Sequence, residues 1–136
     1  MKQKGCGKSG WGKTDVIRDF EREEGKGADM AYESKFKRDD IDELFKAVLL
    51  LENEEDCYRF FEDICTVNEI HAIAQRLQVA KLLSEDKTYN EIEDITKAST
   101  ATISRVNKCL VYGSEGYKRI LKRLEESEEN KADQED

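Results

Sequence analysis

Residues 89–110 read YNEIEDITKASTATISRVNKCL and contain the signals of two successive helices. Thr88, just before this stretch, and Glu91 have the spacing of a capping box, so a first helix is predicted from Tyr89 to about Thr96. A second helix is predicted from Thr100 to Leu110, with Ser99 or Thr100 as its cap. The short connection between the two helices has the length and the turn of a helix-turn-helix that binds DNA.

The second helix of this pair has two contrasting faces. Three apolar residues recur on one face and are expected to hold the helix on the core: Ile103, Val106 and Leu110. The other positions are expected to face outward: Thr100, Ala101, Thr102, Ser104, Arg105, Asn107 and Lys108. Short side chains at a helix N-terminus let the backbone approach base edges, and cations one turn later suit phosphates. A plain structural hairpin would explain the periodicity, but not the small, uncharged first turn followed by cations.

The charge of the chain is unevenly distributed. The 136 residues carry a net charge of −8, which taken as a whole argues against a nonspecific binder of nucleic acid or of anionic membranes. Residues 97–123 nevertheless carry +6, whereas residues 39–57 carry −7 and residues 124–136 carry −6. The predicted recognition helix therefore lies in a strongly basic window, and we expect only weak nonspecific affinity for DNA.

The rest of the chain is also predicted to be helical. Proline is absent and alternating β-branched runs are missing. Further helix starts precede periodic apolar runs at Asp39 with Asp42, Asn53 with Asp56, Thr66 with Glu69, and Ser114. Together with the pair above, these starts predict an all-α domain of six helices. In the last helix we expect four residues to face inward: Tyr117, Ile120, Leu121 and Leu124.

Three regions follow from this pattern. Residues 39–124 are predicted to form the folded domain. Residues 1–38 are expected to be a mostly disordered extension, and residues 125–136 an acidic, disordered tail. The first two helices are dense in Leu and Phe for so small a domain, which suggests that a second subunit buries part of their surface. An ordinary monomeric core stays open as the alternative, because periodicity alone does not separate exposed from buried apolar positions.

The N-terminal region contains a second motif. A match to G-x-x-x-x-G-K-[ST], the loop that cradles nucleotide phosphates, occurs at Gly7, Gly12, Lys13 and Thr14. Such a loop requires a buried strand before it and a parallel sheet around it. No apolar run precedes the match and no later segment has the pattern of a strand, so we attribute it to chance. Asp15–Glu24 has the pattern of a helical turn or two, and Met30 fits as an alternative start of translation.

Other kinds of chemistry find little support in the sequence. The four cysteines, Cys6, Cys57, Cys65 and Cys109, form no CxxC pair and are expected to be thiols. His71 has no nearby Ser or Cys arranged for a catalytic pair. No apolar stretch approaches the roughly 18 to 20 residues that span a bilayer. We therefore predict a cytoplasmic protein that is not an enzyme and has no metal site, no cofactor and no membrane partner.

The stretch Ala98–Arg105, ASTATISR, resembles the tryptophan-repressor superfamily, as do Asn68-Glu69-Ile70 and Gln75-Arg76-Leu77. The resemblance extends from Asp39 to Tyr117 and is strongest to the YerC/YecD-type branch, through Cys57–Phe61 and Asn107–Leu110. It implies a six-helix, intertwined homodimer that reads a palindromic operator in the major groove and regulates transcription, as a repressor. It also implies that Ala101, Thr102 and Ser104 face bases, while Arg105 contacts the DNA backbone.

The sequence departs from the family at the pocket for the corepressor. Arg76 and Arg105 match the two arginines of that pocket, but a glycine that leaves room for the indole ring is Val106 here, and the serine of the pocket is Cys109. Arg76, Arg105, Val106 and Cys109 therefore form the candidate effector pocket. A β-branched side chain in place of a hydrogen fills the space for the indole, so we predict that the protein does not bind tryptophan.

Two further departures concern the helix pair itself. The glycine usual in the turn is Lys97, which costs about 1 kcal/mol if that residue needs a positive φ. Glu93 stands where the repressor has a phosphate-binding lysine, which lowers the expected affinity. The leading hypothesis is a dimeric, sequence-specific regulator bound to double-stranded DNA. The alternative is a helical protein–protein interaction module of the same fold that does not bind DNA.

Overall fold

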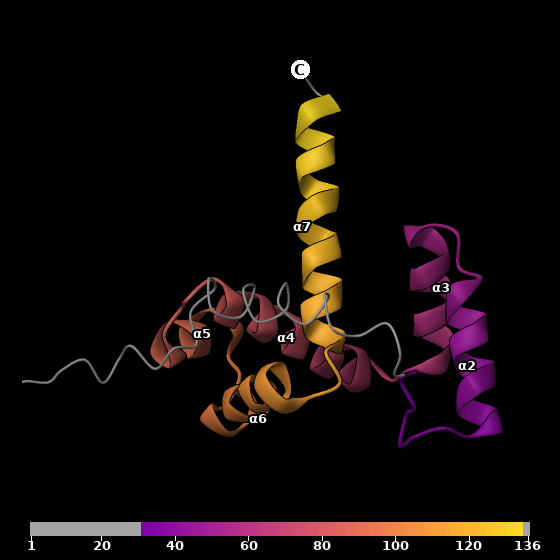
Figure 1. The fold of residues 1–136 in the computed structure, drawn as a ribbon, viewed down its shortest axis with the longest axis horizontal. Helices are drawn as coiled ribbons and strands as arrows, with labels where there is room; N and C mark the ends of the chain where they lie inside the picture. Colours follow the sequence, from indigo (N-terminus) through magenta and orange to yellow (C-terminus); the bar gives the residue numbers. More distant parts are fainter. Residues whose placement is uncertain (1–30, 135–136) are drawn as a thin grey trace, which may run out of the picture. The chain divides into compact units, whose positions relative to one another are not determined.

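The computed structural model describes residues 31–134, which contain six helices and no strand. They are α2 (Asp39–Leu49), α3 (Glu54–Ile64), α4 (Val67–Ser84), α5 (Tyr89–Thr96), α6 (Thr100–Tyr112) and α7 (Gly116–Gln134) (Figure 1). The prediction of six helices in an all-α chain is confirmed. The expectations for residues 1–30, including the phosphate-loop match and the short helix near residue 20, lie outside the described residues. Within the described part, no helix is long and apolar enough to cross a membrane.

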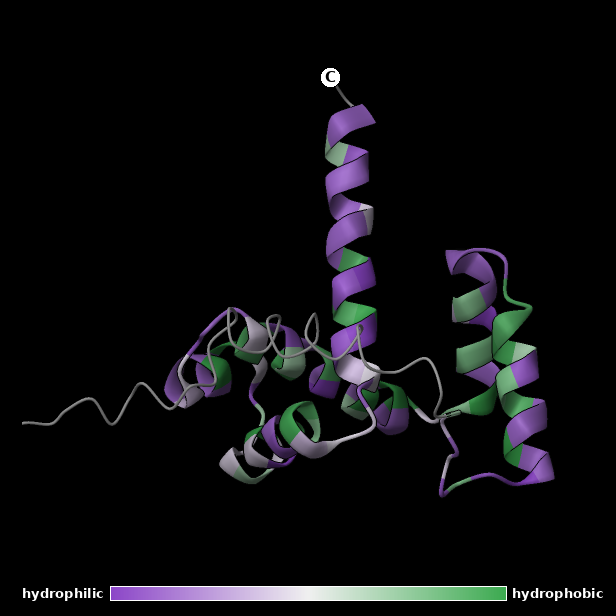
Figure 2. Ribbon diagram, in the orientation of Figure 1, coloured by the Kyte–Doolittle hydropathy of each residue, from purple (hydrophilic) through white to green (hydrophobic). Residues whose placement is uncertain are grey.

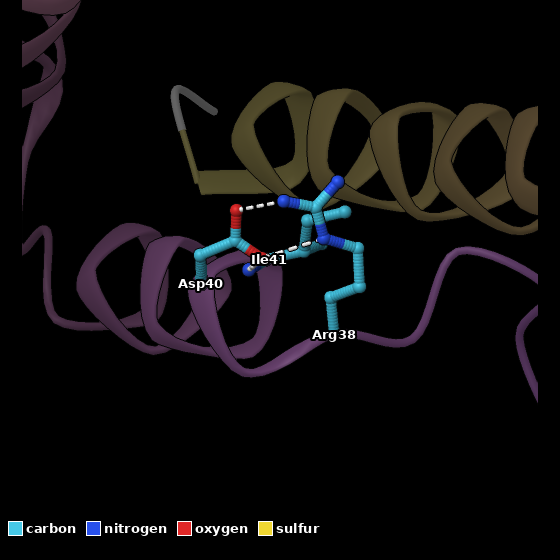
Figure 3. Close-up of polar contacts among 3 residues, drawn as sticks. All are labelled: Arg38, Asp40 and Ile41. Carbon is cyan, nitrogen blue, oxygen red and sulfur yellow. Dashed lines mark hydrogen bonds and ion pairs between the residues drawn. The ribbon is translucent and has the colours of Figure 1, made fainter.

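The chain divides into two units, and the first described one comprises residues 31–73. Its helices α2 and α3 both begin with three acidic residues in the first turn, where the helix dipole favours negative charge. Asn53 caps α3 by accepting a hydrogen bond from the amide of Asp56 at 2.9 Å. The N-cap of α2 is Arg38, whose guanidinium pairs with Asp40 at 2.7 Å and 3.0 Å (Figure 3). The predicted start at Asp39 is thus the first helical residue.

Apolar side chains of this unit remain on its surface. Neither α2 nor α3 contains a buried residue, although hydrophobic residues lie along both helices (Figure 2). Phe60 and Phe61 contact each other edge to face, with ring centroids 5.5 Å apart. Large side chains that stay exposed are Phe45, Leu49, Leu50, Tyr58 and Ile64. Hence α2 and α3 leave several large apolar side chains exposed to solvent in the single chain, while others are half-buried.

The second unit contains the buried core, within residues 74–134. Nine apolar residues are buried there: Val79, Ala80, Leu83, Ile92, Ala98, Ile103, Val106, Leu110 and Leu121. They come from the second half of α4, from α5, from the turn before α6, from α6 and from α7, and together form one small core cluster. The three α6 residues predicted to face the core are among them, with exposures of 0%, 2% and 3% for Ile103, Val106 and Leu110.

The capping box of α5 is formed as predicted. The Glu91 amide donates to the Thr88 hydroxyl at 3.2 Å, and the Thr88 amide donates to the Glu91 carboxylate at 2.7 Å. Thr66 and Glu69 form the same pair of bonds, at 3.2 Å and 2.7 Å, at the start of α4. Each box satisfies two backbone amides that helix geometry leaves without a partner.

The Glu91 carboxylate makes stability depend on pH. The amide and the hydroxyl of Thr88 hold the pKa of Glu91 below its ordinary value, with a smaller contribution from the Lys87 ammonium. Because the folded pKa lies below the unfolded one, this stabilisation is present above the unfolded pKa and is lost as the pH falls through the folded pKa. NMR titration is expected to show the lowered pKa of Glu91. In Glu91→Gln, which keeps the hydrogen-bond acceptor, stability is expected to depend less on acid; an unchanged acid profile contradicts this.

Lys97 adopts the left-handed conformation in the turn between α5 and α6, with a φ of 61°. A side chain with a Cβ is strained there, whereas glycine is not. Lys97→Gly is therefore expected to raise the free energy of unfolding by about 1 kcal/mol, measured by urea denaturation. Lys97→Ala is the control, because it removes the charge and keeps the strain. Equal stability of the two variants would show that the left-handed backbone carries no cost.

Glycine is required at the end of α6 for a different reason. The helix ends at Tyr112, immediately before the predicted stop at Gly113. The Gly113 amide donates to the carbonyl oxygen of Cys109 at 2.9 Å. A Cβ at Gly113 would collide with that same oxygen. A side chain at this position therefore requires the end of the helix to move.

The last helix differs from the prediction in two respects. Leu121 is buried and Tyr117 is half-buried, but Ile120 and Leu124 are 42% and 39% exposed, so the predicted inward face is only partly covered. The expected disordered tail is wrong for residues 125–134, because α7 continues to Gln134. Glu, Lys, Ala and Gln favour helices, and this preference outweighs the repulsion among the acids. Lys81 of α4 also pairs with Glu128 at 3.7 Å.

Candidate nucleic-acid interface

The outer face of α6 contains the residues that were predicted from the sequence to contact DNA. Because Ile103, Val106 and Leu110 are buried, the remaining positions of the helix point away from the core. Five of the predicted residues are exposed: Thr100, Ala101, Ser104, Arg105 and Lys108. Thr102 and Asn107 are half-buried at the edges of this face. One helix face thus presents small, uncharged side chains first and two cations one turn later.

A hydrogen-bonded cap fixes the N-terminus of α6. The Ser99 hydroxyl accepts a hydrogen bond from the Thr102 amide at 3.2 Å. The hydroxyls of Ser99 and Thr102 lie 3.1 Å apart and are bonded to each other. The Thr102 hydroxyl therefore already has a partner within the helix. This cap holds the first turn of α6 in one conformation.

The turn before α6 is tied to two other helices. The Thr96 hydroxyl donates to the carbonyl oxygen of Ile92 at 2.7 Å and accepts from the Ala98 amide at 3.1 Å. The Gln75 side-chain amide of α4 donates to the Thr96 carbonyl oxygen at 3.0 Å. Gln75 thus positions the turn, a role that sequence patterns did not predict, since its partner lies 21 residues away. In the sequence, Gln75 stands out only as part of the Gln75-Arg76-Leu77 match to the family.

Charge changes sign between neighbouring helices. The described chain has no acidic residue on α6, which carries Arg105 and Lys108. The first half of α7 adds four cations: Lys118, Arg119, Lys122 and Arg123. In contrast, Glu93 and Asp94 are exposed on α5. A polyanion is therefore attracted to α6 and the start of α7 and is repelled by the outer face of α5.

Three members of the candidate effector pocket influence the phenol of Tyr117 electrostatically. Burial raises the pKa of Tyr117, as does nearby Cys109, while Arg76 and Arg105 act in the opposite direction. Arg76, Arg105 and Cys109 are themselves exposed. Val106 differs, because only 2% of its surface is exposed and it belongs to the core. Arg76, Arg105 and Cys109 thus all act electrostatically on Tyr117, a residue that the sequence placed only in the core.

The pKa of Tyr117 tests this grouping. Arg76→Gln or Arg105→Gln is expected to raise the pKa further, and Cys109→Ser is expected to lower it, measured by absorbance during alkaline titration. The pKa of Tyr117 is higher in the folded than in the unfolded chain. Its contribution to stability is therefore present below the unfolded pKa and is lost as the pH rises through the folded pKa. Arg59→Gln is the control, since Arg59 pairs with Glu55 at 2.7 Å on α3. An unaltered Tyr117 titration in all three pocket variants would exclude the grouping.

The sequence of this chain is similar to those of known proteins. The family profile described as Trp repressor protein matches residues 39–125. The uncharacterized protein YerC of Bacillus subtilis (strain 168) is 52% identical over 94 residues, which cover 69% of this chain and 90% of that protein.

Two solved structures are similar as well. A protein from Staphylococcus aureus, assigned provisionally as a Trp repressor, superposes with a TM-score of 0.65 at 53% identity, over 67% of this chain and 91% of that one. A TrpR-like protein from Eubacterium eligens ATCC 27750 gives a TM-score of 0.64 at 51% identity, over 66% and 93% of the two chains. This chain therefore resembles both proteins in sequence as well as in fold.

Proposed function

Because the chain belongs to the Trp repressor family, we propose that it is a sequence-specific transcriptional regulator, a repressor, that binds a palindromic operator as a homodimer. The observation that carries the proposal is the outer face of α6. It combines a short, uncharged first turn with Arg105 and Lys108 one turn later, on a helix that buried residues fix to the core. In a helix-turn-helix, the N-terminal residues of the second helix contact base edges in the major groove.

The roles of individual residues follow from their places on α6. Thr100, Ala101, Thr102 and Ser104 are close to the N-terminus and short enough to let the helix approach the bases. Arg105 and Lys108 lie about one turn further along and suit phosphates beside the groove. With only these two cations on α6 and acids on α5, nonspecific attraction is limited, so specific contacts must supply most of the affinity.

The exposed surface of α2 and α3 supports the homodimer. Soluble monomers rarely expose a large contiguous apolar surface. Here neither helix has a buried residue, and Phe45, Leu49 and Tyr58 are 58%, 83% and 61% exposed. A second copy of the chain that covers this surface also supplies the second α6 helix that a palindromic operator requires.

Substitution of the recognition face tests the proposal. Selection of genomic fragments at low salt is expected to enrich one DNA motif. Thr102→Ala combined with Arg105→Ala is expected to weaken binding of that motif by at least about 100-fold while the dimer persists. Thr66→Ala combined with Arg59→Ala is the matched control, because it removes a capping hydroxyl and an exposed arginine away from α6. Circular dichroism checks that both variants are folded.

Two outcomes would overturn the proposal. The first is selection that enriches no motif, and the second is a recognition-face variant that binds the motif as tightly as the original chain. Either outcome favours a helical interaction module, which would use the acidic surface of α5 and of the second half of α7 to bind a protein partner. The proposal assigns no catalytic role to any residue.

A further inference from the structure

We propose that the first turn of α6 recognises thymine through its 5-methyl group, and that Thr100, Ala101 and Thr102 are the residues that select it. The inference rests on the proposed function, because it concerns the bases that α6 meets in an operator. It goes further by naming a base and the chemical group that is read. It depends on which side-chain groups remain available at the exposed N-terminus of the helix.

Few polar side-chain groups are available in residues 100–102, and Ser104 adds one exposed hydroxyl further along. Ala101 is exposed and offers only a methyl group, and exposed Thr100 offers a methyl group beside its hydroxyl. The Thr102 hydroxyl is bonded to the Ser99 hydroxyl at 3.1 Å, and the Ser99 hydroxyl also accepts from the Thr102 amide. The polar ends of Ser99 and Thr102 are therefore engaged in the cap. Methyl groups make up much of what this turn presents to a ligand.

The four bases present different chemical groups in the major groove and are therefore contacted by different side chains. Guanine is read best by Arg or Lys, adenine by Asn or Gln, and cytosine by Asp or Glu. Residues 100–104 contain none of these residue types, and the first long polar side chain on the helix is Arg105. Thymine differs from the other bases because it offers a methyl group, which favours contact with Ala or with the methyl group of Thr. The first turn of α6 thus matches thymine better than any other base.

The short side chains also make such contacts feasible. Because Ile103 is buried and no exposed side chain of residues 100–104 is longer than threonine, the helix backbone can approach the groove floor closely enough for methyl groups to touch. Removing one buried methyl group from such a contact is expected to weaken binding about fourfold. A palindromic operator presents the same base in both half-sites, so changing both is expected to weaken binding about fifteenfold.

Replacing thymine by uracil in the operator is the direct test, because uracil lacks only the methyl group. Operators from the selection are synthesised with deoxyuridine at each thymine in turn, in both half-sites. Binding to the full-length protein is expected to fall about fifteenfold at one or more positions near the α6 N-terminus and to stay unchanged at thymines between or outside the half-sites.

Matched substitutions assign the methyl contact to a residue. Thr100→Ser and Thr102→Ser remove a methyl group and keep the hydroxyl, so the cap at Ser99 is preserved. Ala101→Gly removes the only side-chain carbon at that position. In the variant that lacks the contacting methyl group, uracil is expected to cost nothing further. Thr88→Ser is the control, since it shortens a capping threonine of α5 and is expected to leave the uracil effect intact.

The outcomes separate this inference from the proposed function. Selection without any motif would overturn both. A selected motif that binds equally well with uracil at every thymine would overturn the thymine contact and leave the regulator standing. A uracil effect that stays the same size in all three methyl-deletion variants would overturn the assignment to the first turn of α6. A uracil effect that disappears in one of them supports the inference.

Discussion

Leu49→Asp is expected to break up the proposed homodimer and to destabilise its fold, although 83% of the Leu49 surface is exposed in the single chain. In a monomer, a substitution at such a position changes stability by about 0.5 kcal/mol or less. In a dimer that covers α2 and α3, the same change removes a buried leucine and places a carboxylate in an apolar interface. We expect the dimer dissociation constant to rise by at least about 100-fold.

Sedimentation equilibrium measures the dissociation constant, and urea denaturation at two protein concentrations shows whether folding and association are coupled. Lys46→Asp on the same helix is the control, because it introduces the same carboxylate at an exposed polar position. The control is expected to remain dimeric. If Leu49→Asp leaves both the dissociation constant and the urea denaturation unchanged, α2 and α3 face solvent in the native protein.

The periodicity of the sequence could not show whether a second chain covers α2 and α3. It identified the apolar faces of α2 and α3, but an apolar stripe has the same pattern whether its own core or a second chain covers it. In α6, by contrast, the stripe of Ile103, Val106 and Leu110 is buried as predicted, because neighbouring helices of the same chain cover it. Sequence patterns thus predicted where the apolar faces lie, and only the structure distinguishes the covered from the uncovered ones.

Local signals predicted the helix boundaries well where side chains bond to the nearby backbone. The capping box of Thr88 and Glu91 and the cap at Ser99 both involve residues three apart in sequence, so their spacing is visible without a structure. At α2 the predicted start, Asp39, is the first helical residue, although the N-cap, Arg38, makes no side-chain cap bond. Helix ends are therefore predictable to the degree that side chains satisfy them.

Contacts between distant segments were beyond sequence patterns. The bond from Gln75 to Thr96 joins two helices, and no spacing rule connects these residues. The grouping of Arg76, Arg105 and Cys109 around Tyr117 likewise depends on how three helices pack. The helical continuation of α7 was not predicted because its acidic composition is typical of a solvated chain, whereas its Glu, Lys, Ala and Gln residues favour a helix.

Val106→Gly is expected to destabilise the protein by about 3 kcal/mol, because Val106 is a core residue rather than part of an open pocket. Removing its side chain leaves a cavity next to Ile103 and Leu110 and costs about 2 kcal/mol. Glycine within a helix adds about 1 kcal/mol. Urea denaturation measures the sum, and Val106→Ala isolates the part due to the cavity.

The same burial bears on the predicted lack of tryptophan binding. A side chain that is 2% exposed and packed among core residues leaves no room at its own position for an indole ring. Calorimetry of the original chain with L-tryptophan is therefore expected to show no binding heat.

Val111→Ala, at a half-buried position of the same helix, is the control for the stability measurements and is expected to lower the free energy of unfolding less than Val106→Ala. Low-micromolar tryptophan affinity, or a Val106→Gly variant as stable as the original, would contradict the assignment of Val106 to the core, because both require space that a packed core does not contain.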